Sequence, residues 1–296
     1  MRKSLSRFGR LMACGASLIG LAAVQALLAS GAEAVPGLQR TARTSVSDSS
    51  TFKTVAARCP VGKRVLGGGG TITGGRGQVV LQQLQPVQTA TDDRFVVGAR
   101  EDGTGYAGNW QLTAHALCAN PLPGYNILPS GSASPSSNSP QNTLSFCLGQ
   151  PLVGFGGSIN GAAGQVHLTN LASGSTSTFD FATIAAQEDA NGFGGAWIVF
   201  VYAVCANTPA NLTTVSATTP ASSANKAATV TCPAGTRVHS AGAQLPPAGS
   251  SPVDPSLVID QIAIGPQLRS VTVRAVEDES GTATNWSVRA LALCGP

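Results

Sequence analysis

Apolar and polar residues alternate over residues 110–118 with the period of two that is typical of a half-buried β-strand. The same alternation returns over residues 286–294. The two apolar faces consist of Trp110, Leu112, Ala114, Ala116 and Cys118, and of Trp286, Val288, Ala290, Ala292 and Cys294. The strand expected at 197–205 differs, because its second face, Ile198, Phe200, Tyr202 and Val204, is apolar too. We therefore expect this middle region to pack against its neighbours or to carry an exposed apolar patch.

These strands close three similar segments, which we take as β repeats over residues 51–121, 142–208 and 225–296. In each segment a Glu-Asp pair begins nine residues before a tryptophan, and the tryptophan lies eight residues before a cysteine. The chain has only three tryptophans, and all of them lie in this pattern. The shared positions are Glu101, Asp102, Trp110 and Cys118; Glu188, Asp189, Trp197 and Cys205; and Glu277, Asp278, Trp286 and Cys294. We expect about five strands in each repeat.

Six of the seven cysteines follow residue 34, and an even number in a secreted chain predicts a disulfide framework. One bond within each repeat is the simplest pairing that respects the repetition, although pairing between neighbouring repeats stays open. The expected bonds are Cys59–Cys118, Cys147–Cys205 and Cys232–Cys294. Closing a loop of about 60 residues stabilises a small domain by roughly 4 kcal/mol in the chain-entropy model.

The first 34 residues read as a secretory signal peptide with a basic start, an apolar run from Leu11 to Leu28 and small residues before Val35. A retained membrane anchor is the alternative. Four of the 18 basic and one of the 14 acidic residues lie in this segment, so the remaining chain has a net charge of +1. That balance argues against nucleic acid as a partner, and against membrane binding once the signal is removed.

The repeats are separated by stretches rich in Ser, Pro, Thr and Ala. These are a leader at 35–50 and linkers at 122–141 and 209–224, which we expect to be flexible or extended. Charged residues make up only 11% of the chain, compared with roughly 25% in an average soluble protein. The sequence thus predicts an all-β, secreted protein of tandem, disulfide-closed antiparallel repeats.

The run Cys59-Pro60-Val61-Gly62-Lys63-Arg64-Val65 before Gly67–Gly70, repeated in Cys232–Val238, resembles a β-module of bacterial and phage secreted proteins. In that family the module lies distal to collagen-like segments and assembles as a trimer. A weaker similarity links the chain to the β-prism of vitelline membrane outer layer proteins. The resemblance implies a monomer that acts as a fused pseudo-trimer, with pseudo-three-fold, β-prism-like packing; three separate β-sandwich beads are the alternative. It implies no activity.

Glu101, Glu188 and Glu277 stand in phase with the apolar face of a strand, where an unpaired carboxylate is costly. The simpler interpretation is that each accepts backbone or tryptophan N–H bonds before an Asp/Gly turn. The speculative one is that the three converge and hold a cation such as calcium. A glycine shared by all repeats, Gly69, Gly156 and Gly242, is expected to mark a bulge or a close backbone approach.

Catalysis and cofactor binding find little support in the sequence. The histidines, His115, His167 and His239, stand at non-equivalent positions and are expected as surface or strand residues. The match to GxGxxG at 103–108 lies in a turn between strands, where a nucleotide loop would need a following helix.

We therefore expect a secreted, non-enzymatic structural or binding protein of the extracellular space or cell envelope, with a glycan or envelope surface as its partner. Tyr106, Phe193 and the Phe200/Tyr202 face could offer aromatic platforms, although core packing is the more expected role of each. A carbohydrate-active or other hydrolase is the alternative.

Overall fold

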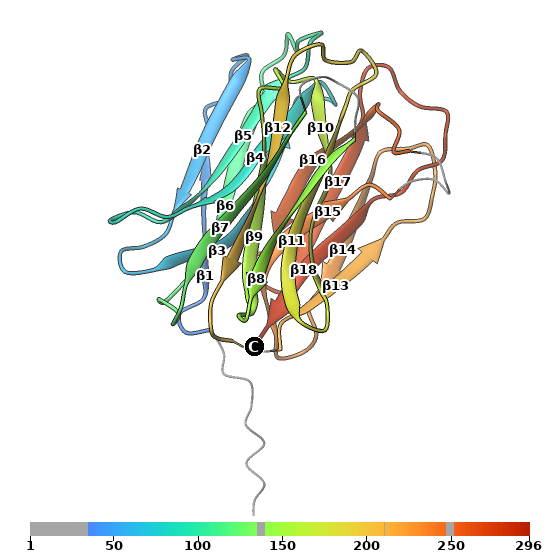
Figure 1. Ribbon diagram of the computed structural model, residues 1–296. Helices are drawn as coiled ribbons and strands as arrows, with labels where there is room; N and C mark the ends of the chain where they lie inside the picture. Colours follow the sequence, from blue (N-terminus) through green and yellow to red (C-terminus); the bar gives the residue numbers. More distant parts are fainter. Residues whose placement is uncertain (1–34, 135–139, 210, 247–251) are drawn as a thin grey trace, which may run out of the picture. The chain divides into compact units, whose positions relative to one another are not determined.

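A computed structural model describes residues 35–134, 140–209, 211–246 and 252–296. The expected signal peptide, residues 1–34, lies outside the described residues, so its cleavage stays a prediction. The described part of the chain forms 18 β-strands and no helix (Figure 1). We divide the strands into three successive segments of six.

The first segment contains β1 (Gln39–Thr44), β2 (Phe52–Arg58), β3 (Arg64–Thr73), β4 (Val79–Val87), β5 (Arg94–Glu101) and β6 (Gln111–Ala119). The second contains β7 (Asn126–Ser134), β8 (Gln141–Leu148), β9 (Leu152–Asn160), β10 (Val166–Ser175), β11 (Phe179–Glu188) and β12 (Trp197–Cys205). The third contains β13 (Thr213–Thr218), β14 (Lys226–Thr231), β15 (Arg237–Gln244), β16 (Leu257–Ile264), β17 (Ser270–Glu277) and β18 (Arg289–Gly295).

These strands form three antiparallel sheets of six, and every sheet combines two segments. The first sheet has the order β1-β6-β3-β16-β17-β14, the second β2-β5-β4-β9-β12-β7, and the third β13-β18-β15-β10-β11-β8. Each segment thus gives three strands to one sheet and three to another. Because strands of different segments pair, the alternative of three separate beads is wrong; the described residues from Val35 to Pro296 form one compact unit.

Where strands of two segments pair within a sheet, only one or two residue pairs form, and a glycine allows the close approach of the backbones. Thr71 pairs with Gln261, Ser158 with Gln83, and Gln244 with Asn170 where the segments meet. Close to these pairs, a Cβ atom on Gly69, Gly156 or Gly242 would collide with the backbone carbonyl of the partner strand, respectively Ile262, Leu84 and Leu171. The expected close backbone approach at this shared glycine is confirmed.

The predicted leader and linkers each contribute an extended strand to a sheet. β1 falls in the leader, β7 in the first linker and β13 in the second, and each forms the edge of a sheet (Figure 1). Each predicted repeat contains the expected five strands, and the edge strand brings its segment to six. All three strands pair with the strand that carries the second cysteine of their segment.

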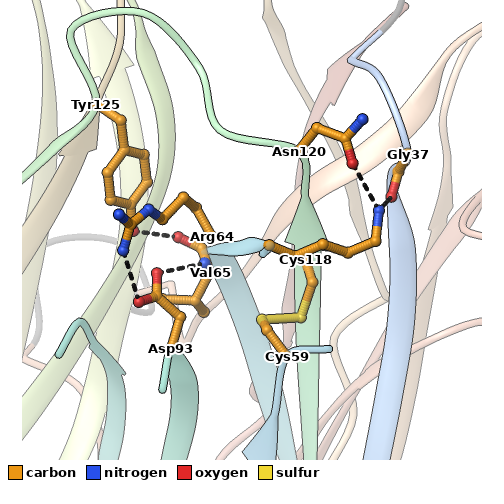
Figure 2. Close-up of a disulfide and its surroundings, with 9 residues drawn as sticks. Gly37, Cys59, Arg64, Val65, Asp93, Cys118, Asn120 and Tyr125 are labelled. Atoms are coloured by element: carbon orange, nitrogen blue, oxygen red, sulfur yellow. Dashed lines mark hydrogen bonds and ion pairs between the residues drawn. A yellow bond between two sulfur atoms is a disulfide. The ribbon is translucent and has the colours of Figure 1, made fainter. Parts of the chain in front are cut away.

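The core lies on the strand faces that the alternating pattern predicts. Every residue of the two predicted faces, from Trp110 to Cys118 and from Trp286 to Cys294, is buried. The disulfides Cys59–Cys118, Cys147–Cys205 and Cys232–Cys294 are formed, with Cα–Cα distances of 5.6, 5.7 and 5.7 Å (Figure 2 shows the first). Each bond joins two sheets, since its cysteines belong to or adjoin strands of different sheets.

The doubly apolar strand β12 is covered only in part. Val204 is buried, while Ile198, Phe200 and Tyr202 stay half-buried. A Cβ atom on Gly131 of β7 would lie 2.6 Å from the Phe200 ring, so this ring occupies the space that the glycine leaves on the neighbouring strand. The outer face of this strand therefore stays partly exposed.

Candidate functional site

Glu101, Glu188 and Glu277 each bind the tryptophan of their own segment. Their Oε1 atoms accept the indole N–H of Trp110, Trp197 and Trp286 at 3.1, 3.0 and 2.9 Å. This confirms the simpler interpretation of the shared glutamate, because the bond satisfies two polar groups in the core. We call these three Glu–Trp pairs, together with the three disulfides, the shared frame.

The glutamates also order the turns that follow them. The second carboxylate oxygen of Glu188 accepts the backbone N–H of Phe193 at 3.0 Å, and that of Glu277 accepts the N–H of Thr282 at 3.3 Å. The adjacent aspartates cap the same turns; Asp102, for example, accepts the N–H of Gly105 at 2.9 Å. The expected Asp/Gly turn is therefore present beside each Glu–Trp pair.

The structure gives no support to a cation held by the three glutamates. Each is engaged with its own tryptophan, and the described residues include no group of three His, Cys, Asp or Glu side chains arranged to bind a metal ion. The aspartates of the pairs influence one another. Burial is the main cause that raises the pKa of Asp189 to about 6, and the negative charges of Asp102 and Asp278 contribute to that rise.

Sequence reasoning missed a basic partner of the tryptophan. The Lys53 ammonium lies 4.5 Å from the centre of the Trp110 ring, and the Lys226 ammonium lies 3.5 Å from that of Trp286. Both donate to the backbone carbonyl of the same tryptophan. The signal was available, since both lysines stand six residues before the first cysteine of their segment, where the second segment has Gln141.

The histidines occupy strands, as expected, but two of them do not lie at the surface. His167 in β10 and His239 in β15 are 2% and 0% exposed, whereas His115 in β6 is half-buried. Burial lowers the pKa of all three to about 4. They are therefore neutral at physiological pH.

The expected aromatic platforms belong largely to the packed structure. Tyr106 and Phe193 are half-buried and pack against the main core. Phe200 and Tyr202 are half-buried; the Phe200 ring packs over Gly131, and the Tyr202 hydroxyl is 3.4 Å from the Ser158 hydroxyl. These side chains leave little aromatic surface for a ligand.

An exposed aromatic surface does exist, at a place that the sequence analysis did not single out. It lies on the outer face of the third sheet at its β8 edge, and we call it the phenylalanine patch. Its residues are the exposed Leu144, Phe146 and Leu148 and the half-buried Phe179 and Phe181. Leu148 is 74% exposed, and Leu144 and Phe146 are 40% and 39% exposed. The period of two in β8 was the available signal, because these side chains alternate with buried Ser145 and Cys147.

Register and ring packing make the patch continuous. Phe146 pairs with Phe181 across β8 and β11, and the Phe146 ring meets the Phe179 ring edge-on at 5.0 Å between centroids. A Cβ atom on Gly174 of β10 would meet the Phe181 ring. Phe181 therefore lies across the glycine of the next strand, and the patch extends over three strands.

Polar groups border the patch on the same outer face. The next rows of the sheet pair Thr183 with Leu144, and Ala185 with both Asn142 and Asn170. The side-chain oxygen of Asn170 is buried and has no hydrogen-bond partner among the described residues, so it is closed to a ligand. The face thus offers aromatic surface beside the exposed Asn142 and the half-buried Thr183.

The same strand positions look different in the other two sheets. In the second sheet, Arg58 and Arg94 stand at the positions of Phe146 and Phe181, and both pair with Asp92. In the first sheet these positions hold Thr231 and Ser270. The apolar surface is therefore a property of the second segment alone.

The chain matches no protein-family model, and a search of curated proteins finds no match either. No helix in the described ranges is long and apolar enough to cross a membrane. The three disulfides indicate an extracellular or secreted protein.

Proposed function

We propose that this chain is a secreted, non-enzymatic binding protein of the extracellular space or cell envelope, and that it recognises glycans through the phenylalanine patch. The observation that carries the proposal is the exposed apolar surface around Phe146, where Phe146 and Phe181 occupy positions that are charged or hydroxylated in the other sheets. Monomeric soluble proteins rarely expose a contiguous apolar surface without using it.

The chemistry of the patch suits a sugar. The aromatic rings offer a flat apolar surface for the C–H groups of a sugar ring, and Thr183 and Asn142 supply donors and acceptors for its hydroxyls. Sheet pairing fixes the positions of all these groups, so little ordering is needed on binding.

The proposal includes the arrangement of the segments. We propose a monomer that acts as a pseudo-trimer, in which the segments pack with pseudo-three-fold symmetry as in a β-prism. The strand order supports it. In every segment the first, sixth and third strands form half of one sheet, in that order from its edge, and the second, fifth and fourth strands form half of another. The shared frame, repeated three times, supports it as well.

A glycan array with the secreted chain tests the binding function. We expect selective retention of a glycan class and a loss of at least tenfold in affinity when Phe146→Thr and Phe181→Ser are combined. These substitutions introduce the residues that the third segment carries at the same positions, so the sheet should tolerate them. Phe52→Ser, at a 49% exposed phenylalanine of the second sheet, is the matched control and should bind normally.

A hydrolase is the second candidate, because one observation favours it. Asp189, with a pKa of about 6, lies near Asp102 and Asp278, and a carboxyl group with a raised pKa beside ionised ones is the arrangement of a general acid. A hydrolase panel distinguishes the two functions. Turnover that Asp189→Asn abolishes would contradict the binding proposal, whereas unchanged binding without turnover supports it.

A further inference from the structure

An arginine-lined cavity opens on the first sheet, at the end opposite the Glu-Asp turns. Its volume is about 620 Å³. Three basic side chains line it, Arg40 of β1, Arg237 of β15 and Arg269 of the turn between β16 and β17. Its remaining lining residues are Leu38, Gln39, Pro266, Gln267 and Leu268. No acidic residue lines it, so its charge is uncompensated.

The three arginines have no carboxylate partner in the part of the chain that the structure describes. The ion pairs found there involve Lys53, Arg58, Arg64, Arg94 and Arg274. Arg40 donates to the backbone carbonyl of Ile264, which holds its side chain across the sheet. Arg237 and Arg269 are exposed and extend from backbone that is itself fixed.

The first segment shows what normally faces such an arginine. There Arg64 directly precedes Val65, and Val65 pairs with Cys118. In the third segment Arg237 directly precedes Val238, which pairs with Cys294 in the same way. The carboxylate of Asp93 pairs with Arg64 at 3.1 Å and accepts the backbone N–H of Val65 at 3.1 Å (Figure 2).

The third segment replaces this aspartate by an arginine. The backbone carbonyl of Asp93 accepts the N–H of Cys59, and the carbonyl of Arg269 accepts the N–H of Cys232, so Asp93 and Arg269 are equivalent. The N–H of Val238 is satisfied differently, by the carbonyl of Leu268 at 2.7 Å. The cavity has thus lost the carboxylate that would neutralise Arg237 and has gained a second cation.

The aromatic cover is also missing from the cavity. In the second sheet, Tyr125 closes the equivalent site; its hydroxyl donates to the Val65 carbonyl at 2.6 Å and its ring lies 5.9 Å from the Arg64 guanidinium (Figure 2). Tyr125 directly precedes the residue that pairs with Cys205, and Leu38 directly precedes the residue that pairs with Cys118. Leu38 is therefore the counterpart of Tyr125, and its shorter side chain leaves the site open.

From this exchange we infer that the cavity lined by Arg40, Arg237 and Arg269 binds an oxyanion group, carboxylate or sulfate, of an acidic polysaccharide. Guanidinium groups recognise both oxyanions through paired N–H donors. The amides of Gln39 and Gln267 supply hydrogen bonds for hydroxyls, and Leu38, Pro266 and Leu268 supply apolar contact for a sugar ring. The inference rests on the proposed glycan-binding function but places an acidic sugar at a site separate from the phenylalanine patch.

Calorimetric titration of the secreted chain tests the inference with four probes: polygalacturonate, dextran sulfate, neutral dextran and sodium sulfate. We expect at least one charged polymer to bind and neutral dextran not to bind at this site. Arg237→Gln and Arg269→Asp should each weaken that binding at least tenfold, and added salt should weaken it in the wild type. Whichever charged polymer binds identifies the oxyanion as carboxylate or sulfate.

Two controls keep the outcome decisive. Arg43→Gln removes the same charge from β1 at a residue that does not line the cavity, and it should bind as the wild type does. Arg269→Asp restores the residue type found in the first segment, so the variant should fold, which its melting temperature checks. Equal binding by the wild type and the cavity variants, or no binding of any anion, would overturn the inference.

The experiment also separates this inference from the proposed function. If the phenylalanine variants lose glycan binding while the arginine variants keep it, the proposed function stands and the inference fails. If sodium sulfate binds at the arginines but neither charged polymer does, the site is an anion site and the polysaccharide assignment is overturned.

Discussion

At one of two equivalent sites Arg64 of β3 is paired with Asp93 and covered by Tyr125, whereas at the other the equivalent Arg237 of β15 stands beside Arg269 and the shorter Leu38. The backbone around the two sites is alike. Each site lies between the start of the third strand of its segment, β3 or β15, and the hairpin turn before β5 or β17, next to a disulfide. One site is therefore internally neutralised and closed, and the other is charged and open.

The third sheet adds a further version of this site. Asp180 retains the role of Asp93 and accepts the backbone N–H of Leu152 at 3.2 Å, but Pro151 replaces the arginine. Asp180, Thr214 and neighbouring residues line a cavity of about 240 Å³ there. The backbone is therefore alike at the three sites, because the shared frame positions it, but the charge differs. The Arg64 site is neutralised by an ion pair, the Arg237 site is positive and the Asp180 site is negative.

Converting the closed site into the open one should have the largest effect. Asp93→Arg removes the acceptor of the Val65 N–H and places a second cation beside Arg64, so we expect a loss of about 3 kcal/mol in the free energy of unfolding. Urea unfolding measures it. Asp93→Asn keeps an acceptor and should cost less. A change below about 1 kcal/mol for Asp93→Arg would contradict the importance of the pair.

Removing the cover should have the next largest effect. Tyr125→Leu, which copies Leu38, loses the hydrogen bond to the Val65 carbonyl and part of the buried ring, so we expect a loss of about 2 kcal/mol. Tyr125→Phe loses only the hydrogen bond and should cost about 1 kcal/mol. If both variants unfold like the wild type in urea, Tyr125 does not close this site.

A third change sharpens the comparison within the shared frame. Gln141 stands where the other segments have Lys53 and Lys226, and its amide oxygen and nitrogen have no partner among the described residues. Gln141→Lys should place an ammonium over Trp197 and stabilise the chain by about 1 kcal/mol. Lys53→Gln should do the reverse at Trp110. Thermal unfolding of both variants checks the signs; destabilisation by Gln141→Lys would be the contrary result.

The smallest effect at neutral pH is expected at His239. The bulge position that it occupies in β15 is taken by Leu66 in β3 and Val153 in β9. Burial lowers its pKa to about 4, below the value near 6.5 of an unfolded chain. The unfolded state therefore binds the proton first, and the wild type loses stability as the pH falls from about 6.5 to 4.

His239→Leu should remove this contribution. We expect the variant to gain in melting temperature over the wild type as the pH is lowered from 7.5 to 4.5, with little difference at pH 7.5. A difference in melting temperature between variant and wild type that does not change with pH would show that the pKa of His239 is the same in the folded and unfolded states.

The sequence predicted the strands that carry the core, because the alternation from Trp110 to Cys118 is regular and the cysteine and tryptophan spacing is fixed. It also predicted the disulfides and the acceptor role of Glu101 and its counterparts, since a carboxylate in phase with apolar residues needs a buried donor. Local patterns were sufficient for these features.

The edge strands and the surface sites were not predictable in the same way. β13 is mostly exposed and β1 is exposed over its second half, so neither has an apolar alternation to detect. The exchange of strands between segments rests on one or two residue pairs at each join, which no local pattern records. The arginine cavity required the equivalence of Asp93 and Arg269, which strand register and hydrogen bonding to the cysteines establish.

The central claim is that the frame is common while the charge at each equivalent site is individual, and one pair of variants tests it most directly. Urea unfolding of Arg64→Gln and Arg237→Gln compares the same arginine in the closed and the open site. The account predicts a loss of about 1–3 kcal/mol for Arg64→Gln, which leaves Asp93 unpaired, and a change within about 0.5 kcal/mol for Arg237→Gln. Equal losses in the two variants would contradict it.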